Sequence, residues 1–171
     1  MNRSELHCYI EDNIVVSSRQ IIQYFVSQGK TNTSVRKSIS RLKDPFRSVS
    51  KIHLANKAKI FYHKAFWKTP DYCEKLTKIL LEEHSVYGYA LEALRAKSGF
   101  IVEKDFPIIC GSGNQKGHIP PELIKQNLLD SGLLSSINIE AMGTYLYLSA
   151  YNNISVQACL LYTSPSPRDT E

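Results

Sequence analysis

The sequence lacks any apolar run near the roughly 20 residues that a helix needs to cross a bilayer. Its four cysteines, at positions 8, 73, 110 and 159, are too few and too scattered for a disulfide scaffold. The first thirteen residues contain no apolar core of the kind found in secretory signals. We therefore predict a protein of the reducing cytoplasm, with no membrane partner.

The sequence also lacks a complete catalytic or cofactor motif. Residues 111–117, GSGNQKG, do not have the glycine and lysine spacing of a phosphate-binding loop, and prolines follow where amide donors would be needed. A zinc set would have to combine residues with no short spacing between them: Cys73, His84, Cys110 and His118. We predict no metal and no cofactor, and the sequence leaves open whether the whole protein is an enzyme.

The composition, 43% apolar and 22% charged, is typical of a soluble globular protein. A chain of 171 residues holds one ordinary domain or two small ones, and the charge changes sign near Thr69 and Pro70. We predict an α+β protein with one unit over residues 1–68 and a second over residues 70–158.

Acidic residues are almost absent from residues 30–68. That segment has 11 lysines and arginines against the single acid Asp44, a net charge of +10, whereas the rest of the chain has 10 basic and 15 acidic residues. Concentrated positive charge of this kind favours a polyanionic partner such as nucleic acid, because bound phosphates release their counterions. The alternative is a solvated lysine-rich surface without a partner.

Three helices are predicted in the first unit. Residues 4–12 form one, with Ser4 as its cap; a second starts at Ser17 or Ser18 and stops at Gly29; a third covers residues 34–43. The third helix has one apolar stripe, Val35, Ile39 and Leu42, at spacing i, i+4 and i+7. Its other positions are basic or hydroxylic, which is the composition of a helix that reads DNA.

A basic hairpin is predicted after this helix. Asp44-Pro45 ends the helix, and two apolar runs, over residues 49–54 and 60–62, flank a turn at residues 55–57. The candidate DNA-binding residues are Ser34, Arg36, Lys37, Ser38, Ser40, Arg41 and Lys43 on the helix, and Lys51, Lys57 and Lys59 on the hairpin. Of these we expect Ser34, Lys37 and Ser38 to face bases and Arg36 and Arg41 to face phosphates.

The run VRKSISRLK, followed by a short strand, a polar turn and IFYH, resembles winged helix-turn-helix proteins over about residues 14–64. The nearest resemblance is to bacterial regulators and antitoxins that carry such a domain at the N-terminus. It implies that the hairpin is a wing that contacts the sugar-phosphate backbone. Aromatic residues at 61, 62, 66 and 67 are expected in the core and between the units.

The second unit is predicted to repeat this order. Helices are expected over residues 71–84, 86–98 and from Pro121 to Gly132, strands over residues 100–102 and 106–110, and a hairpin from Ile137 to Leu148. Three helices followed by a hairpin indicate a second, more acidic winged-helix-like unit. A homodimer or a protein partner bound through this unit stays open.

The last residues have a different origin. Residues 159–169, CLLYTSPSPRD, resemble one reading frame of a transposase-type sequencing adapter, residue for residue. The resemblance implies that residues 159–171 are a non-native tail and that the natural sequence diverges near Ala158. We expect no function in this segment.

The sequence thus predicts a prokaryotic protein that binds double-stranded DNA, such as a transcriptional regulator or an antitoxin-like repressor. One alternative is the N-terminal part of a defence-system nuclease or modification protein whose catalytic domain lay beyond Ala158. Another is a winged-helix scaffold that binds protein.

Overall fold

A computed structural model describes residues 2–151, apart from residues 50, 53, 55–56 and 114–118. The predicted tail, His118 and the tip of the predicted hairpin turn lie outside the described residues. Within the described part, the chain forms seven α-helices and two three-stranded antiparallel sheets, so it is a mixed α+β protein as predicted. None of these helices is long and apolar enough to cross a membrane.

The first half consists of α1 (Arg3–Asn13), β1 (Val15–Ser17), α2 (Ser18–Ser27), α3 (Asn32–Ser40), β2 (Phe46–Ser48) and β3 (Ile60–His63). Each helix begins at a side chain that accepts a backbone N–H of its first turn. Asn2 caps α1 and forms a reciprocal capping box with Glu5, so the predicted cap at Ser4 was wrong. Ser17 caps α2 and Thr31 caps α3.

Two predicted boundaries in this half were wrong. Helix α3 ends at Ser40 and not at Lys43, because the Lys43 carbonyl accepts from the Phe46 N–H in a turn (2.9 Å) that leads directly into β2. The strand before the connection is Phe46–Ser48, and no described residue of 49–54 belongs to a strand. The apolar residues there are buried by tertiary packing and not by strand pairing.

The second half consists of α4 (Pro70–Glu82), α5 (Val86–Ala96), β4 (Phe100–Val102), α6 (Phe106–Gly113), α7 (Pro121–Asp130), β5 (Leu134–Ile139) and β6 (Gly143–Leu148). The predicted strand over residues 106–110 was wrong, since this segment is the start of α6. The predicted hairpin is confirmed, with Ile137 paired to Tyr145 in β5 and β6.

The same element order occurs twice in the chain. Helix, strand, helix, helix, strand, strand describes α1 to β3 and again α5 to β6, apart from a short 3₁₀ turn, Glu103–Asp105. In both sheets the third strand lies in the centre, in the orders β1-β3-β2 and β4-β6-β5. By this correspondence α7 occupies the place in the second half that α3 occupies in the first.

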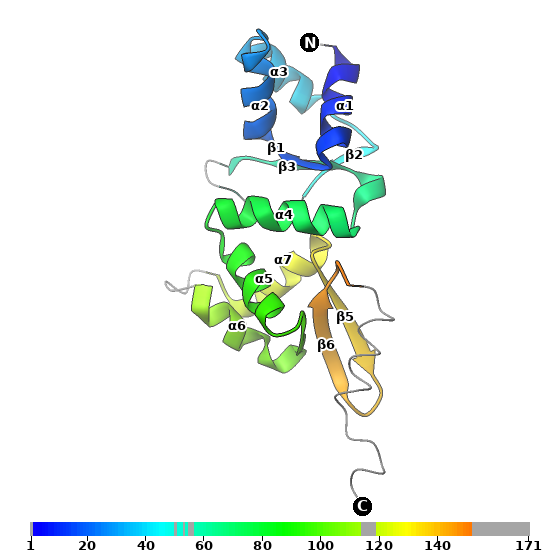
Figure 1. The fold of residues 1–171 in the computed structure, drawn as a ribbon, viewed down its shortest axis with the longest axis vertical. Coiled ribbons are helices and arrows are strands. Elements are labelled where there is room, and N and C mark those ends of the chain that lie inside the picture. The colour runs from blue at the N-terminus through cyan, green and yellow to red at the C-terminus, as the bar shows by residue number, and fades with distance from the viewer. Residues whose placement is uncertain (1, 50, 53, 55–56, 114–118, 152–171) are drawn as a thin grey trace, which may run out of the picture.

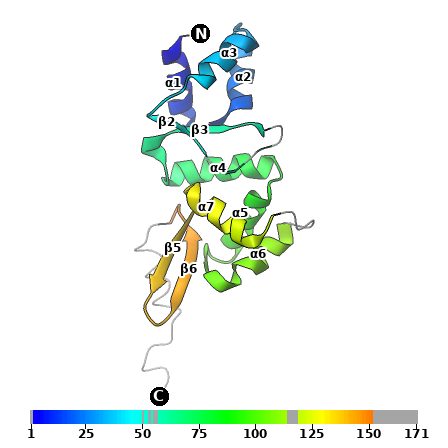
Figure 2. The same cartoon turned by 180° about the vertical axis from the view of Figure 1, so that it is seen from behind.

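Helix α4 joins the two halves (Figures 1 and 2). The first sheet lies between α1–α3 on one face and α4 on the other, and its strands β1 and β3 are buried on both sides. Val16 and Phe61 point toward α1–α3, whereas Val15, Ile60 and Tyr62 belong to a core shared with the second half. The larger of the two cores therefore crosses the predicted boundary near Pro70, while a separate core lies between α1–α3 and the first sheet.

Candidate nucleic-acid interface

A groove of about 720 Å³ lies between α3, the start of α2 and the strands β2 and β3. Its floor is formed by apolar side chains: Ile22, Ile39, Leu42, Phe46 and Phe61. Its basic residues come from three places along the chain: Arg36, Lys43, Arg47, Lys57 and Lys59. All five are exposed, so this basic groove offers guanidinium and ammonium groups to a ligand in solvent.

The two cations on the α3 side of the groove come from the helix and from the turn after it. Arg36 lies in α3 four residues before Ser40, so both fall on the same face of the helix, and Lys43 belongs to the turn that leads into β2. The Arg36 side chain is oriented by a hydrogen bond from its Nε to Asn32 Oδ1 (2.7 Å). Because the asparagine is neutral, this contact leaves the charge of Arg36 uncompensated.

Asp44 is the one acid among the described residues that line the groove. Its carboxylate accepts from Lys64 Nζ at 2.8 Å and lies 3.5 Å from Arg47 Nη2. The hydrogen bond from Lys64, with the charges of Lys64 and Arg47, lowers the pKa of Asp44 below its usual range. Asp44 thus neutralises part of the positive charge of Arg47 and Lys64 at the edge of the groove. Lys43, Lys57 and Lys59 have no acidic partner in the described part of the chain.

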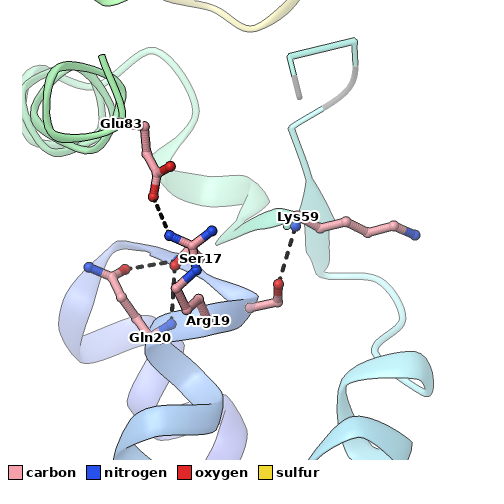
Figure 3. Close-up of polar contacts among 6 residues, drawn as sticks. Ser17, Arg19, Gln20, Lys59 and Glu83 are labelled. Carbon is pink, nitrogen blue, oxygen red and sulfur yellow. Dashed lines mark hydrogen bonds and ion pairs between the residues drawn. The ribbon is translucent and has the colours of Figure 1, made fainter. Parts of the chain in front are cut away.

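The start of β3 is fixed to the start of α2. The Ser18 N–H donates to the Lys59 carbonyl (2.8 Å), and the Lys59 N–H donates to Ser18 Oγ (3.2 Å). Figure 3 shows the Lys59 side chain extending away from this anchored backbone. The start of α2 is in turn joined to the end of α4, because Arg19 Nη1 lies 2.6 Å from Glu83 Oε1. Two hydrogen bonds and an ion pair therefore fix the backbone on the α2 side and on the β3 side of the groove.

The structure brings together only some of the predicted site residues. Arg36, Ser40, Lys43, Lys57 and Lys59 line the groove. Lys37 and Arg41 are exposed but do not line it. Ser34 and Ser38 are half-buried, and Ser38 Oγ donates to the Ser34 carbonyl (3.2 Å).

Lys51 does not line the groove, and its ammonium lies 2.7 Å from Asp130 at the end of α7. Arg47, Ser48 and Ser18 were not predicted as site residues although they line the groove. Arg47 belongs to the basic segment, and its position in the strand β2 is the signal that could have identified it.

The corresponding surface of the second half carries little uncompensated positive charge. Lys125 is the one basic residue of α7, and its ammonium lies 2.8 Å from Glu122 and 3.1 Å from Glu103. These contacts raise the pKa of Lys125, with the hydrogen bond to Glu122 as the largest cause. Although the two halves share an element order, the single cation of α7 is paired with acids, whereas the cations of the first groove have one acid among them.

Metal-binding side chains do not gather in the described residues: no group of three histidine, cysteine, aspartate or glutamate side chains there could hold an ion. No protein-family model, curated protein or solved structure matches the chain. The groove and its charges are thus the basis for a functional assignment.

Proposed function

We propose that this chain is a double-stranded DNA-binding protein built from two winged-helix units, of which the first binds the duplex through the basic groove. The observation that carries the proposal is the convergence of five cations on one groove that is lined by a single described acid; they come from α3, the turn after it, β2 and the connection to β3. An element order of helix, strand, helix, helix, strand, strand supports the winged-helix assignment. In this fold α3 is the recognition helix and the connection between β2 and β3 is the wing.

We propose that each side of the groove binds a different part of the duplex. Arg36 on α3 and Lys43 in the turn after it can bind phosphates on one side of a major groove entered by α3. Lys57 and Lys59 can bind the backbone on the other side, where a wing contacts DNA. Lys37 on α3 and Arg41 at its C-terminal cap lie outside this groove but are exposed, and they extend the positive surface along the duplex.

The biological role we favour is that of a transcriptional regulator or antitoxin-like repressor. The DNA-binding part of a nuclease or modification protein would use the same groove, so both roles depend on the DNA binding proposed here. A scaffold that binds protein is the competing function. It does not account for cations gathered on α3 and the wing with so little acidic compensation.

The proposal is tested by titrating the full chain with short duplexes of unrelated sequence at several salt concentrations, followed by fluorescence anisotropy. Phosphate binding predicts a linear fall of log affinity with log salt, with a slope of about −0.9 for each phosphate neutralised. The double variant Arg36→Ala/Lys43→Ala should bind more weakly at every salt concentration, and its slope should be smaller by about 2.

A matched control removes two cations elsewhere. Lys75→Ala/Lys78→Ala changes the net charge by the same amount on α4, away from the groove, and should leave the slope nearly unchanged. Equal losses of duplex affinity in the two double variants would mean that DNA binding depends on the net charge of the protein and not on the groove. An affinity that does not depend on salt would refute phosphate binding altogether and would favour the protein-binding scaffold.

A further inference from the structure

The connection between β2 and β3, residues 49–59, does not extend freely into solvent in its described part. Ile52 and Leu54 are only 3% and 5% exposed and belong to the same core as Leu76 of α4 and Leu128 of α7. The Val49 N–H also donates to the Ile60 carbonyl (2.8 Å). The middle of the connection is therefore packed against the second half before the chain returns to the groove.

An ion pair fixes this packing at the surface. Lys51 Nζ lies 2.7 Å from Asp130 Oδ2, and Gln126 Nε2 donates to Asp130 Oδ1 (3.0 Å). Both oxygens of the Asp130 carboxylate thus have a partner, and the side chain is held in one orientation at the last residue of α7. The hydrogen bonds from Lys51 and Gln126 lower the pKa of Asp130, so the carboxylate is charged at neutral pH.

The anchored residues lead directly to two cations of the groove. The Lys57 N–H donates to the carbonyl of the buried Leu54 (3.1 Å), and Lys59 follows two residues later with its backbone bound to Ser18. The positions of Lys57 and Lys59 therefore depend on two anchors, one on the second half and one on α2, of which Figure 3 shows the contact of Lys59 with α2.

We propose that Asp130, through its contact with Lys51, is a positioning residue that holds Lys57 and Lys59 in the basic groove, so that the second half sets the DNA affinity of the first. This inference rests on the proposed function. It gives the second half a role that its own surface charge does not indicate, because an acid on α7 would then promote the binding of a polyanion.

The sign of one substitution separates this role from simple electrostatics. Asp130→Asn removes a negative charge from a DNA-binding protein, which by long-range electrostatics alone raises affinity. Positioning predicts the opposite, a duplex affinity about three-fold lower with a smaller salt slope, a modest loss because the ion pair is partly exposed. Glu140→Gln is the control: it makes the same change of charge at an exposed site beside the β5–β6 turn and should not weaken binding.

Two further measurements complete the test. The exchanged pair Lys51→Asp/Asp130→Lys keeps the net charge and should restore affinity to within about two-fold of the wild type, as a partly exposed pair of either polarity contributes similarly. In the free protein, Asp130→Asn should accelerate amide hydrogen exchange at Lys57 and Lys59 without lowering the midpoint of thermal unfolding by more than a few degrees.

Affinity for duplex that is unchanged or higher in Asp130→Asn would overturn the inference while leaving the proposed function intact. The same holds for unchanged exchange at Lys57 and Lys59, which would show that the Asp130 contact does not hold this segment. A wild-type chain without salt-dependent affinity for duplex would instead refute the proposed function, and the inference with it.

Discussion

Gly88 lies where helix α5 packs against the backbone of α4, and its substitution tests the packing of these two helices. A Cβ atom at residue 88 would lie 2.9 Å from the backbone carbon of Leu80 and 2.9 Å from the backbone nitrogen of Leu81. Neither atom can rotate away, so the helices would have to separate. Gly88→Ala gains about 1 kcal/mol of helix propensity, but overpacking typically costs about 1–3 kcal/mol, and here the added Cβ meets the peptide group between Leu80 and Leu81.

We therefore expect Gly88→Ala to lower the free energy of unfolding by about 1–2 kcal/mol. Gly111→Ala is the matched control, because Gly111 also lies in a helix, α6, and a Cβ there would meet nothing within 4 Å. It should raise the free energy of unfolding by up to about 1 kcal/mol. Urea denaturation followed by circular dichroism measures both changes. A Gly88→Ala protein as stable as the wild type would refute the close packing of α5 on α4.

Two further predictions concern the shared core. Tyr72 is fully buried and its hydroxyl donates to the Ser131 carbonyl (2.5 Å), so Tyr72→Phe should cost about 1–2 kcal/mol in the same denaturation assay, and no loss would contradict this hydrogen bond. Burial raises the pKa of Cys73 and of Cys110 to about 11. Alkylation mapped by mass spectrometry should therefore modify the exposed Cys8 first, and rapid modification of Cys73 would contradict its burial. Since these thiols keep their protons in the folded state at a pH where the unfolded chain loses them, stability should fall as pH rises from about 9 to about 11.

Much of the helical structure could be predicted because its signals are local. The Ser17 cap and the apolar face of Ile21 and Phe25 specify α2, and Pro121 at the first turn specifies the start of α7. The hairpin of β5 and β6 could be predicted from its alternating residues for the same reason. These patterns depend on neighbours along the chain, which a sequence contains.

Helix α6 was missed because its apolar run fits a short strand as well as a helix. In the structure Phe106, Ile109 and Cys110 are buried, whereas Ile108 is 73% exposed. That spacing of i, i+3 and i+4 is helical, and it was the signal that could have decided between the two. The number of apolar residues in this run does not distinguish a strand from a helix, whereas their spacing does.

The segment after β2 could not be predicted from local pattern. Ile52 and Leu54 alternate as strand residues do, but they are buried in the core that the first sheet shares with α4 and α7. The same long-range packing explains Lys51, whose partner Asp130 is 79 residues away. A single sequence does not show such a contact, and a cation in a basic segment looks available for DNA until its partner is known.

The residue types of the candidate site could be predicted from the sequence, but the face of α3 that lines the groove could not. The basic segment and the inward residue Val35 follow from the sequence, whereas the choice of Arg36 and Lys43 over Lys37 and Arg41 depends on where the strands β2 and β3 lie. Only the folded sheet determines which side of α3 becomes a wall of the groove.

The central claim, that the basic groove of the first half binds duplex DNA, is tested most directly by nuclear magnetic resonance of the full chain titrated with a short duplex. We expect the largest amide shifts in α3, at Arg47 and from Lys57 to Lys59, with little change in α7 (Pro121–Asp130) apart from its last turn near Asp130. Shifts centred on α7 and the β5–β6 hairpin, or none in the groove, would contradict the account.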